Sequence, residues 1–155
     1  MPVTQRTKAT LLVLSAAGLV GILVNEGFRQ PAYTDTVGVP TIGFGTTEGV
    51  KMGDRITVEK ALIRALTDVS KFEGALKKCV KVPLSQNEYD AYIDFSYNIG
   101  STAFCNSTLV KKLNREDYAG ACAEISRWIK QPELIPRRQR ERALCEGKGL
   151  AKEVH

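Results

Sequence analysis

The sequence has little of what most hydrolases use for catalysis. It contains one histidine, His155, at the last position, where a side chain rarely joins a site. Serine–histidine–aspartate and cysteine–histidine mechanisms need an imidazole within the fold, and zinc amidases need histidine ligands. We therefore expect no metal and no cofactor. If the chain is an enzyme, carboxylates must carry its chemistry.

Cysteines are few and far apart. No Cys-x-x-Cys pair is present, so neither a zinc ribbon nor a thioredoxin-type site is indicated. In an oxidising compartment the four cysteines would persist as two disulfides, and buried free thiols are the alternative. Three pairings are open, of which we predict Cys79–Cys105 and Cys122–Cys145.

No internal repeat or low-complexity tract occurs. With 155 residues, 43% hydrophobic and 25% charged, the chain has the composition of one globular domain, for which a monomer is our default expectation. The net charge of +5 favours polyanions such as nucleic acid, anionic lipid or an acidic wall polymer. The basic residues are scattered and no recognition module is present, so we expect no nucleic-acid partner.

The longest apolar run, residues 9–24, has sixteen residues and no charge, whereas a stable membrane span needs roughly 20. Arg6 and Lys8 precede it, which predicts a cytoplasmic N-terminus and export of the remainder. The run is a cleaved signal peptide ending near 15–17, a buried helix, or an export signal that stays on the chain and later leaves the bilayer. We favour the third interpretation, because seven of the sixteen residues are Ala, Gly, Ser or Thr and weaken the span.

Beyond this run the pattern predicts a small β-hairpin and then helices. Residues 33–47 alternate β-branched residues with glycines, which is typical of short, bent strands. A helix through Glu26 is expected to continue to about Gln30 and to stop at Pro31. The fold class is therefore α+β.

The remaining helices are predicted from caps and apolar periodicity. Each predicted helix runs from its N-terminal signal to its stop: from Thr57 to Val80, from the capping box at 85–88 to Gly100, from Ser107 to Leu113, from Asn114 to before Pro132, and from Pro136 to Gly147.

Glu26 and Asp35 are the candidate catalytic pair. Hydrolysis of a glycosidic acetal needs one protonated carboxyl group and one ionised carboxylate. An apolar setting favours the first state and a polar turn favours the second. Glu26 follows the apolar run and Asp35 lies among threonines and backbone amides, so their settings differ in the required direction.

The spacing E-x8-D-x5-T resembles that of the phage-type lysozymes of glycoside hydrolase family 24. The motif Y-x-D-x-x-G-x-x-T-I-G-x-G is matched from Tyr33 to Gly45. "PLSQNEYDAYIDFSYNIG", "STLVKKLN" and "RRQRERALC" resemble the helical part of that family, so the likeness covers about residues 25–147. It implies a lysozyme-like fold, in which a hairpin lobe and a larger helical lobe flank a cleft.

The resemblance also implies roles. Glu26 would be the general acid, Asp35 the opposing carboxylate, and Thr41 a holder of the attacking water. It implies inversion at the N-acetylmuramic acid–N-acetylglucosamine bond of peptidoglycan, with carboxyl groups roughly 6.5–9.5 Å apart. Tyr33, Asn98 and Arg138 are the candidate substrate-binding residues; a helix C-cap is the alternative for Asn98.

Arg138 belongs to the cluster Arg137, Arg138, Arg140 and Arg142, which is otherwise typical of a solvated helix face.

The apolar run beside Glu26 resembles that of signal-anchor-release endolysins, phage enzymes of host lysis. It implies an anchor segment at 1–24 and a catalytic domain at 25–155. The exported enzyme would be inactive while 9–24 holds it in the inner membrane, and active in the periplasm after release. The run has no cysteine, so we expect loss of membrane potential, rather than thiol exchange, to release it.

Two rival functions remain. A lytic transglycosylase also uses a glutamate but needs no Asp35–Thr41 pair and forms an anhydro product. A wall-binding module or a tethered interaction protein needs no carboxylates at all. The presence of Glu26, Asp35 and Thr41 together disfavours both.

Overall fold

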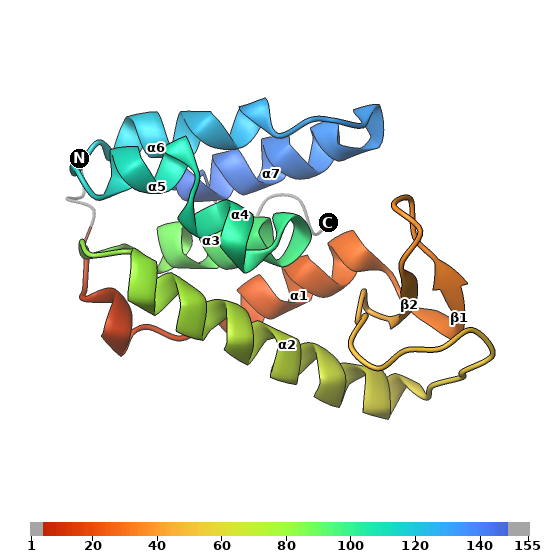
Figure 1. Ribbon diagram of the computed structural model, residues 1–155. Coiled ribbons are helices and arrows are strands. Elements are labelled where there is room, and N and C mark those ends of the chain that lie inside the picture. The colour runs from red at the N-terminus through yellow and green to blue at the C-terminus, as the bar shows by residue number, and fades with distance from the viewer. Residues whose placement is uncertain (1–4, 149–155) are drawn as a thin grey trace. The chain divides into compact units, whose positions relative to one another are not determined.

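The structure, a computed structural model, describes residues 5–148 and confirms the predicted α+β class (Figure 1). Residues 1–4, at the start of the predicted anchor segment, and 149–155, with His155, lie outside this part. The strands are β1 (Arg29–Thr34) and β2 (Pro40–Gly43). The α-helices are α1 (Ala16–Glu26), α2 (Val58–Cys79), α3 (Gln86–Ile99), α4 (Ser101–Cys105), α5 (Thr108–Leu113), α6 (Tyr118–Glu124) and α7 (Ile135–Cys145).

Three short 3-10 helices complete the secondary structure of residues 5–148: η1 (Ala9–Leu11), η2 (Ile125–Arg127) and η3 (Pro132–Leu134). The chain divides into two compact units. Among the described residues, 20–71 form the hairpin unit, and 5–19 with 72–148 form the helical unit. Helices α1 and α2 each contribute residues to both units.

The β-hairpin begins earlier in the chain than predicted, because its first strand starts at Arg29. Helix α1 ends at Glu26, followed by Gly27 with φ +69°, a left-handed conformation that glycine adopts without strain. Pro31 therefore lies within β1 instead of ending a helix, and the prediction that the helix continues to Gln30 is wrong. Strands β1 and β2 are antiparallel, with Tyr33 opposite Thr41.

The hairpin unit has its own apolar core. Its buried side chains come from β2, from the loop that follows and from α2: Ile42, Phe44, Val50, Ile56, Ala61 and Ala65. Gly43 has φ +64°, and a Cβ atom at this position would lie 3.0 Å from the Cβ of Ala61. The absence of a side chain at Gly43 therefore lets β2 approach α2 closely.

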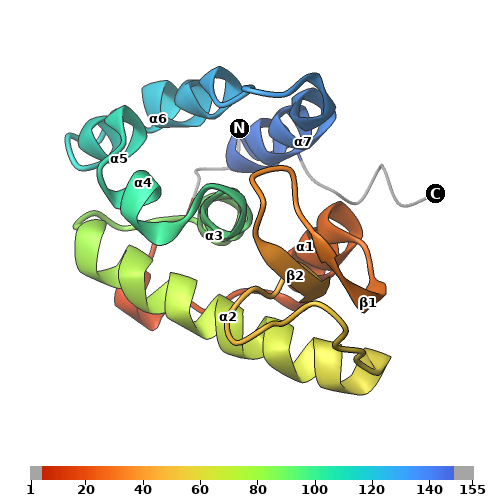
Figure 2. The same ribbon diagram turned by 45° about the vertical axis from the view of Figure 1, so that its right-hand side comes forward.

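The helical unit is built around α3. Ser85 and Glu88 form the predicted capping box, and the helix stops before Gly100, which has φ +94°. Every residue from Glu88 to Ser96 is buried. The view in Figure 2 runs nearly along α3, with α4 and α7 beside it. Phe95 packs edge-on against Trp128 and Phe104.

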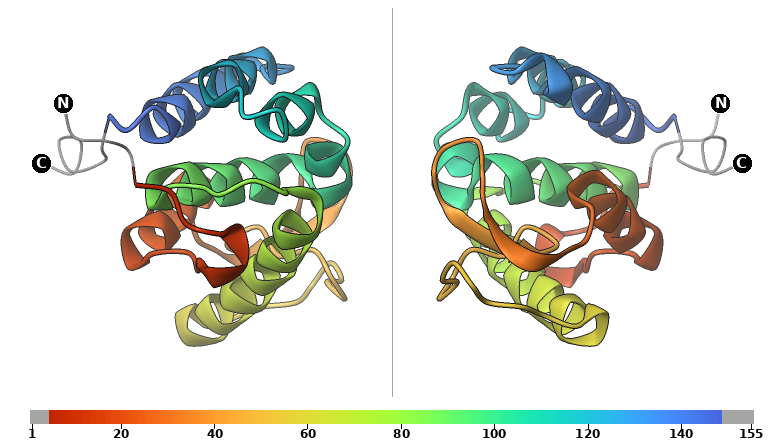
Figure 3. Two further views of the ribbon diagram at one scale, coloured as in Figure 1. Left: turned by 90° about the vertical axis from the view of Figure 1, so that its left-hand side faces the viewer. Right: turned by 90° about the vertical axis from the view of Figure 1, so that its right-hand side faces the viewer.

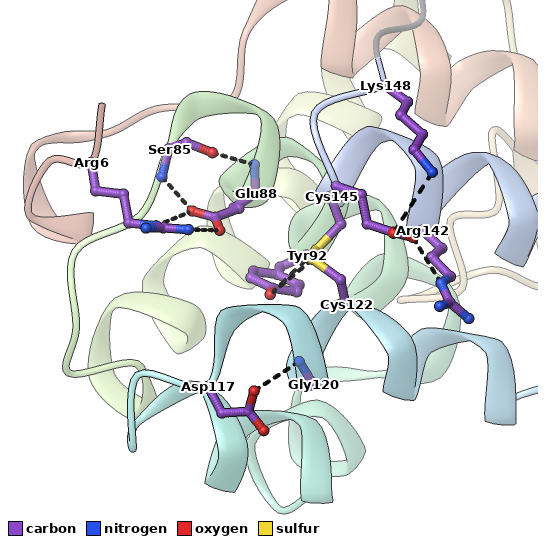
Figure 4. The surroundings of a disulfide bond; sticks show 11 residues. Arg6, Ser85, Glu88, Tyr92, Asp117, Gly120, Cys122, Arg142, Cys145 and Lys148 are labelled. Carbon is purple, nitrogen blue, oxygen red and sulfur yellow. Dashed lines mark hydrogen bonds and ion pairs between the residues drawn. A yellow bond between two sulfur atoms is a disulfide. The ribbon is translucent and has the colours of Figure 1, made fainter. Parts of the chain in front are cut away.

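Two disulfides join helices within this unit. They pair Cys79 with Cys105 and Cys122 with Cys145, the predicted pairs, each with 5.7 Å between Cα atoms. The Tyr92 hydroxyl lies 3.3 Å from the sulfur of Cys145, and the ring is directed at this disulfide (Figure 4).

The Asn114 prediction is wrong, because the N-cap of α6 is Asp117, whose carboxylate accepts from the Gly120 amide. The Asn114 amide side chain instead links two backbone groups, the Cys79 carbonyl and the Lys81 amide. Thr57 and Ser107 cap their helices as predicted.

Within residues 5–148, no helix has the length and apolar character needed to cross a bilayer. The apolar run 9–24 is divided in this structure among η1, a non-helical stretch at 12–15 and most of α1.

We expect Gly43→Ala to destabilise the fold more than Gly49→Ala. Both glycines have positive φ, which costs an alanine about 1–2 kcal/mol. Gly49 has open space around it, whereas the new methyl group at Gly43 would press on Ala61 and cost roughly 1–3 kcal/mol more. Urea unfolding of both variants measures the difference, and equal losses would show that the contact with α2 carries no constraint.

Candidate active site in the hairpin unit

Asp35 lies in the turn that joins β1 to β2. The Gly38 amide donates to the Asp35 carbonyl at 3.1 Å, the Asp35 amide donates to the Val39 carbonyl at 3.0 Å, and Gly38 has φ +86°. These features identify a type I turn closed by a left-handed glycine. Asp35 Oδ1 accepts from the amides of Val37 at 3.0 Å and Val39 at 2.7 Å. Between residues 5 and 148 nothing donates a hydrogen bond to Oδ2, so one carboxylate oxygen is fixed and the other is available.

Thr41 follows the same turn on β2. Its side chain is 3% exposed, and its hydroxyl donates to the Val39 carbonyl at 2.9 Å. Val39 therefore connects the two residues, because its amide binds Asp35 and its carbonyl binds Thr41. With its proton engaged, the Thr41 oxygen can accept a hydrogen bond from another molecule.

Glu26 is the last residue of α1 and is partly buried. Its negative charge acts on Tyr33 in β1. Burial raises the pKa of the Tyr33 phenol above its usual value, and the charges of Glu26 and Asp35 raise it further. The Arg29 guanidinium, 4.3 Å from the ring centre, opposes this effect. Both carboxylates thus act on one tyrosine, whose hydroxyl remains a hydrogen-bond donor at neutral pH.

The other candidate residues, Asn98 and Arg138, lie together in the helical unit. Arg138 is 1% exposed, and its guanidinium donates to both Glu141 oxygens at 2.9 and 2.8 Å. It also donates to the Trp128 carbonyl at 2.8 Å and to Oδ1 of Asn98. Since Arg138 engages the Asn98 oxygen, the Asn98 NH₂ group is the part left for a further acceptor.

Arg137 extends this buried network. It donates to Asp94 at 2.8 Å and to Glu141 at 3.0 Å. The expectation that the arginine cluster is a solvated face is therefore wrong for Arg137 and Arg138. The spacing of Glu141 at i+3 and i+4 from the two arginines was the sequence signal for these pairs.

Within residues 5–148, no group of histidine, cysteine, aspartate and glutamate side chains could hold a metal ion. The structure thus places Glu26, Tyr33, Asp35 and Thr41 in the hairpin unit, and Asn98 and Arg138 in the helical unit.

The sequence and the fold are similar to those of known proteins. The family model described as phage lysozyme matches residues 24–141. An endolysin of Acyrthosiphon pisum secondary endosymbiont phage 1 is 44% identical over 142 residues, covering 86% of this chain and 97% of that protein. A SAR-endolysin of Pseudomonas phage phiKMV is 40% identical over 115 residues, covering 74% of this chain and 71% of that protein. The muramidase domain of SpmX from Asticaccaulis excentricus has a TM-score of 0.79 at 32% identity, covering 86% of this chain and 97% of that one.

We expect the buried network to make stability depend on pH. Burial, with the nearby Asp94 charge, raises the pKa of Glu141 from 4.5 to about 7, against the opposing effect of Arg138 and Arg137. A raised pKa means that the folded state holds a proton that the unfolded state has lost. This contribution to stability is complete below pH 4.5 and disappears as the pH rises through about 7.

The free energy of unfolding, measured by urea titration from pH 4 to pH 8, tests this expectation. The free energy of unfolding of the wild type should fall as the pH rises. This fall should be absent in Glu141→Gln and present in Glu146→Gln, which loses only surface ion pairs with Arg142 and Lys148. Parallel profiles for the wild type and Glu141→Gln would contradict it.

Proposed function

The chain belongs to the phage lysozyme family and is a glycoside hydrolase, and from this we propose that it is an endolysin acting on bacterial peptidoglycan. We place the cleavage at the β-1,4 bond between N-acetylmuramic acid and N-acetylglucosamine, with inversion at the anomeric carbon. The net charge of +5 suits this anionic wall polymer. One observation carries the chemical argument: Asp35 and Thr41 are joined through the backbone of Val39.

Asp35 and Thr41 are assigned to the attacking water. Asp35 Oδ2 accepts a hydrogen bond from one hydrogen of the water, and the Thr41 oxygen accepts a hydrogen bond from the other hydrogen. With both hydrogens engaged, a lone pair of the water is left to attack the anomeric carbon. Fixing the nucleophile in this way lowers the entropic part of the barrier. Asp35 takes the proton that the water loses, and a water placed between carboxylate and sugar leads to inversion.

Glu26 is assigned as the general acid. Its carboxyl group donates a proton to the glycosidic oxygen as the bond to the anomeric carbon breaks, so the departing sugar leaves as an alcohol.

Substrate contacts are assigned to three further residues. The protonated Tyr33 hydroxyl donates to the glycan beside the carboxylates. The Asn98 NH₂ group donates to a carbonyl oxygen such as that of an N-acetyl group. Arg138 is too deeply buried to face the solvent, so it acts by holding Asn98 in this orientation.

We further propose that residues 1–24 are an anchor segment and that 25–155 are the catalytic domain. Through residues 9–24 the exported monomer stays in the inner membrane without activity, and release delivers the active enzyme to the periplasm. The similarity to a protein described as a SAR-endolysin supports this course, as do Arg6 and Lys8 before the run. Collapse of the membrane potential is the proposed trigger.

Glu26→Gln should lower muramidase activity by roughly 10²–10⁴-fold, because the amide cannot donate a proton in the same way. Purified peptidoglycan is digested and the products are identified by mass spectrometry. The wild type should give reducing-end muropeptides that contain one added water. Glu48→Gln, which alters an exposed glutamate paired with Lys71 in the same unit, serves as the matched control.

Anhydro-muramyl products would identify a lytic transglycosylase and remove the role given to Asp35. An absence of products from released, folded wild type would indicate a wall-binding module instead.

Thr41→Val should lower kcat on the order of 100-fold, since the water loses one of its two acceptors. Thr41→Ser keeps the hydroxyl and should retain most of the activity. Steady-state kinetics on soluble glycan fragments, with unfolding measured in parallel, separates catalysis from stability. Equal activity of the two variants would exclude Thr41 from holding the water.

Fractionation of bacteria that express the full chain tests the anchor. We expect the wild-type protein to be found in the membrane fraction and to show no wall-degrading activity there. An uncoupler should move the protein to the soluble periplasmic fraction in active form. The mass of the released chain distinguishes release of the intact chain from cleavage, because a shorter product would indicate a cleaved signal peptide. A fully active membrane fraction would contradict control by tethering.

A further inference from the structure

Side chains of the helical unit bind backbone groups of the apolar run where that run is not helical. Gln86 donates to the Val13 carbonyl at 2.9 Å. The Leu14 amide donates to Glu73 at 2.7 Å, and the Ser15 amide donates to Asp90 at 3.0 Å. Three consecutive residues thus obtain from side chains on α2 and α3 the hydrogen bonds that a helix would supply. Figure 3 shows the course of the backbone from η1 into α1.

The start of α1 depends on the same contacts. The Ser15 hydroxyl donates to Asp90 Oδ2 at 2.5 Å and accepts from the Gly18 amide at 2.9 Å. Ser15 is therefore the N-cap of α1, and Asp90 holds that cap in place. Asp90 is 4% exposed and also accepts from Gln86 at 2.8 Å, so its carboxylate is already oriented.

Two contacts earlier in the chain extend this attachment. Arg6 forms two hydrogen bonds to Glu88, at 2.9 and 3.0 Å, as Figure 4 shows. Thr7 and Leu84 exchange two backbone hydrogen bonds of 2.8 Å. Arg6 cannot make its contact while it lies on the cytoplasmic side of a membrane.

A bilayer imposes a different arrangement on the same residues. Its interior offers no water, so a spanning segment must satisfy its peptide groups within a continuous helix. The break at 12–15 would leave peptide groups without partners in lipid. Leaving the bilayer therefore exchanges bonds within one helix for bonds to Glu73, Gln86 and Asp90.

We propose that these three side chains form a docking cradle that receives residues 13–18 when the anchor leaves the membrane. The cradle supplies the bonds lost at the break, so it makes the released conformation favourable and sets where α1 begins. This inference rests on the proposed membrane-tethered function.

Gly18 gives the cradle a steric requirement. A Cβ atom at this position would lie 2.8 Å from the Asp90 carboxyl carbon and 2.8 Å from a Leu14 methyl group. Gly18→Ala removes no hydrogen bond and favours a continuous helix, so it should hold the chain in the membrane. Gly74→Ala is the matched control, because Gly74 also lies in a helix and has nothing within 4 Å.

The test follows the full chain in bacteria by membrane fractionation, before and after an uncoupler. For Gly18→Ala we expect a ratio of released to membrane-bound chain about tenfold lower than for Gly74→Ala. Asp90→Asn should lower the ratio about tenfold relative to the wild type. Asp68→Asn, which alters a carboxylate bound to the Thr46 hydroxyl in the hairpin unit, should not lower it.

A double-mutant cycle separates docking from misfolding. If Ser15→Ala and Asp90→Asn act through their shared contact, the double variant should lose less release than the sum of the two single losses. Independent, fully additive losses would overturn the cradle. So would release of Gly18→Ala equal to that of Gly74→Ala while the wild type is tethered. A wild type that never joins the membrane fraction would instead overturn the proposed anchor and, with it, this inference.

Discussion

A peptide group that lies outside a helix or a strand pair needs another hydrogen-bond partner, and side chains provide it at two places where the chain changes direction. At the turn between β1 and β2 the partner is Asp35, which accepts from two amides and fixes the hairpin beside Thr41. At the break before α1 the partners are Glu73, Gln86 and Asp90. In both places side chains replace regular secondary structure. The carboxylate proposed to activate water is itself part of its own scaffold.

Buried charge is treated differently in the helical unit. Arg137 and Arg138 share Glu141, and Asp94 provides a second negative charge. Removing one member would leave another charge buried without its partner, a change that typically costs about 3–5 kcal/mol. Such a network tolerates little adjustment, so the Asn98 side chain that it holds has one orientation. Rigidity of this kind suits a side chain that must meet a sugar in a fixed pose.

Local signals in the sequence predicted local structure well. The capping box at Ser85, the caps Thr57 and Ser107 and the glycines of the hairpin were recognisable because each acts within a few residues. The spacing of Glu26, Asp35 and Thr41 depends on one hairpin and was equally visible. One failure was local, since the helix stops at Gly27 and not at Pro31. Two others depended on distant partners: Asn114 binds groups more than thirty residues away, and Arg137 forms a buried ion pair with Asp94. The break at 12–15 was missed because its partners lie on α2 and α3.

The contact of Gly18 with Asp90 gives the composition of the apolar run a second cause. Small residues in such a run are usually explained by a weak hold on lipid. Here one sequence has to suit two solvents in turn, hydrocarbon and then a polar protein surface, and a bulky residue at the point of contact would serve only the first. Mean hydropathy registers the loss of anchoring strength but not the gain in fit. Substitutions that improve the run as a membrane helix would therefore tend to spoil it as a part of the folded enzyme.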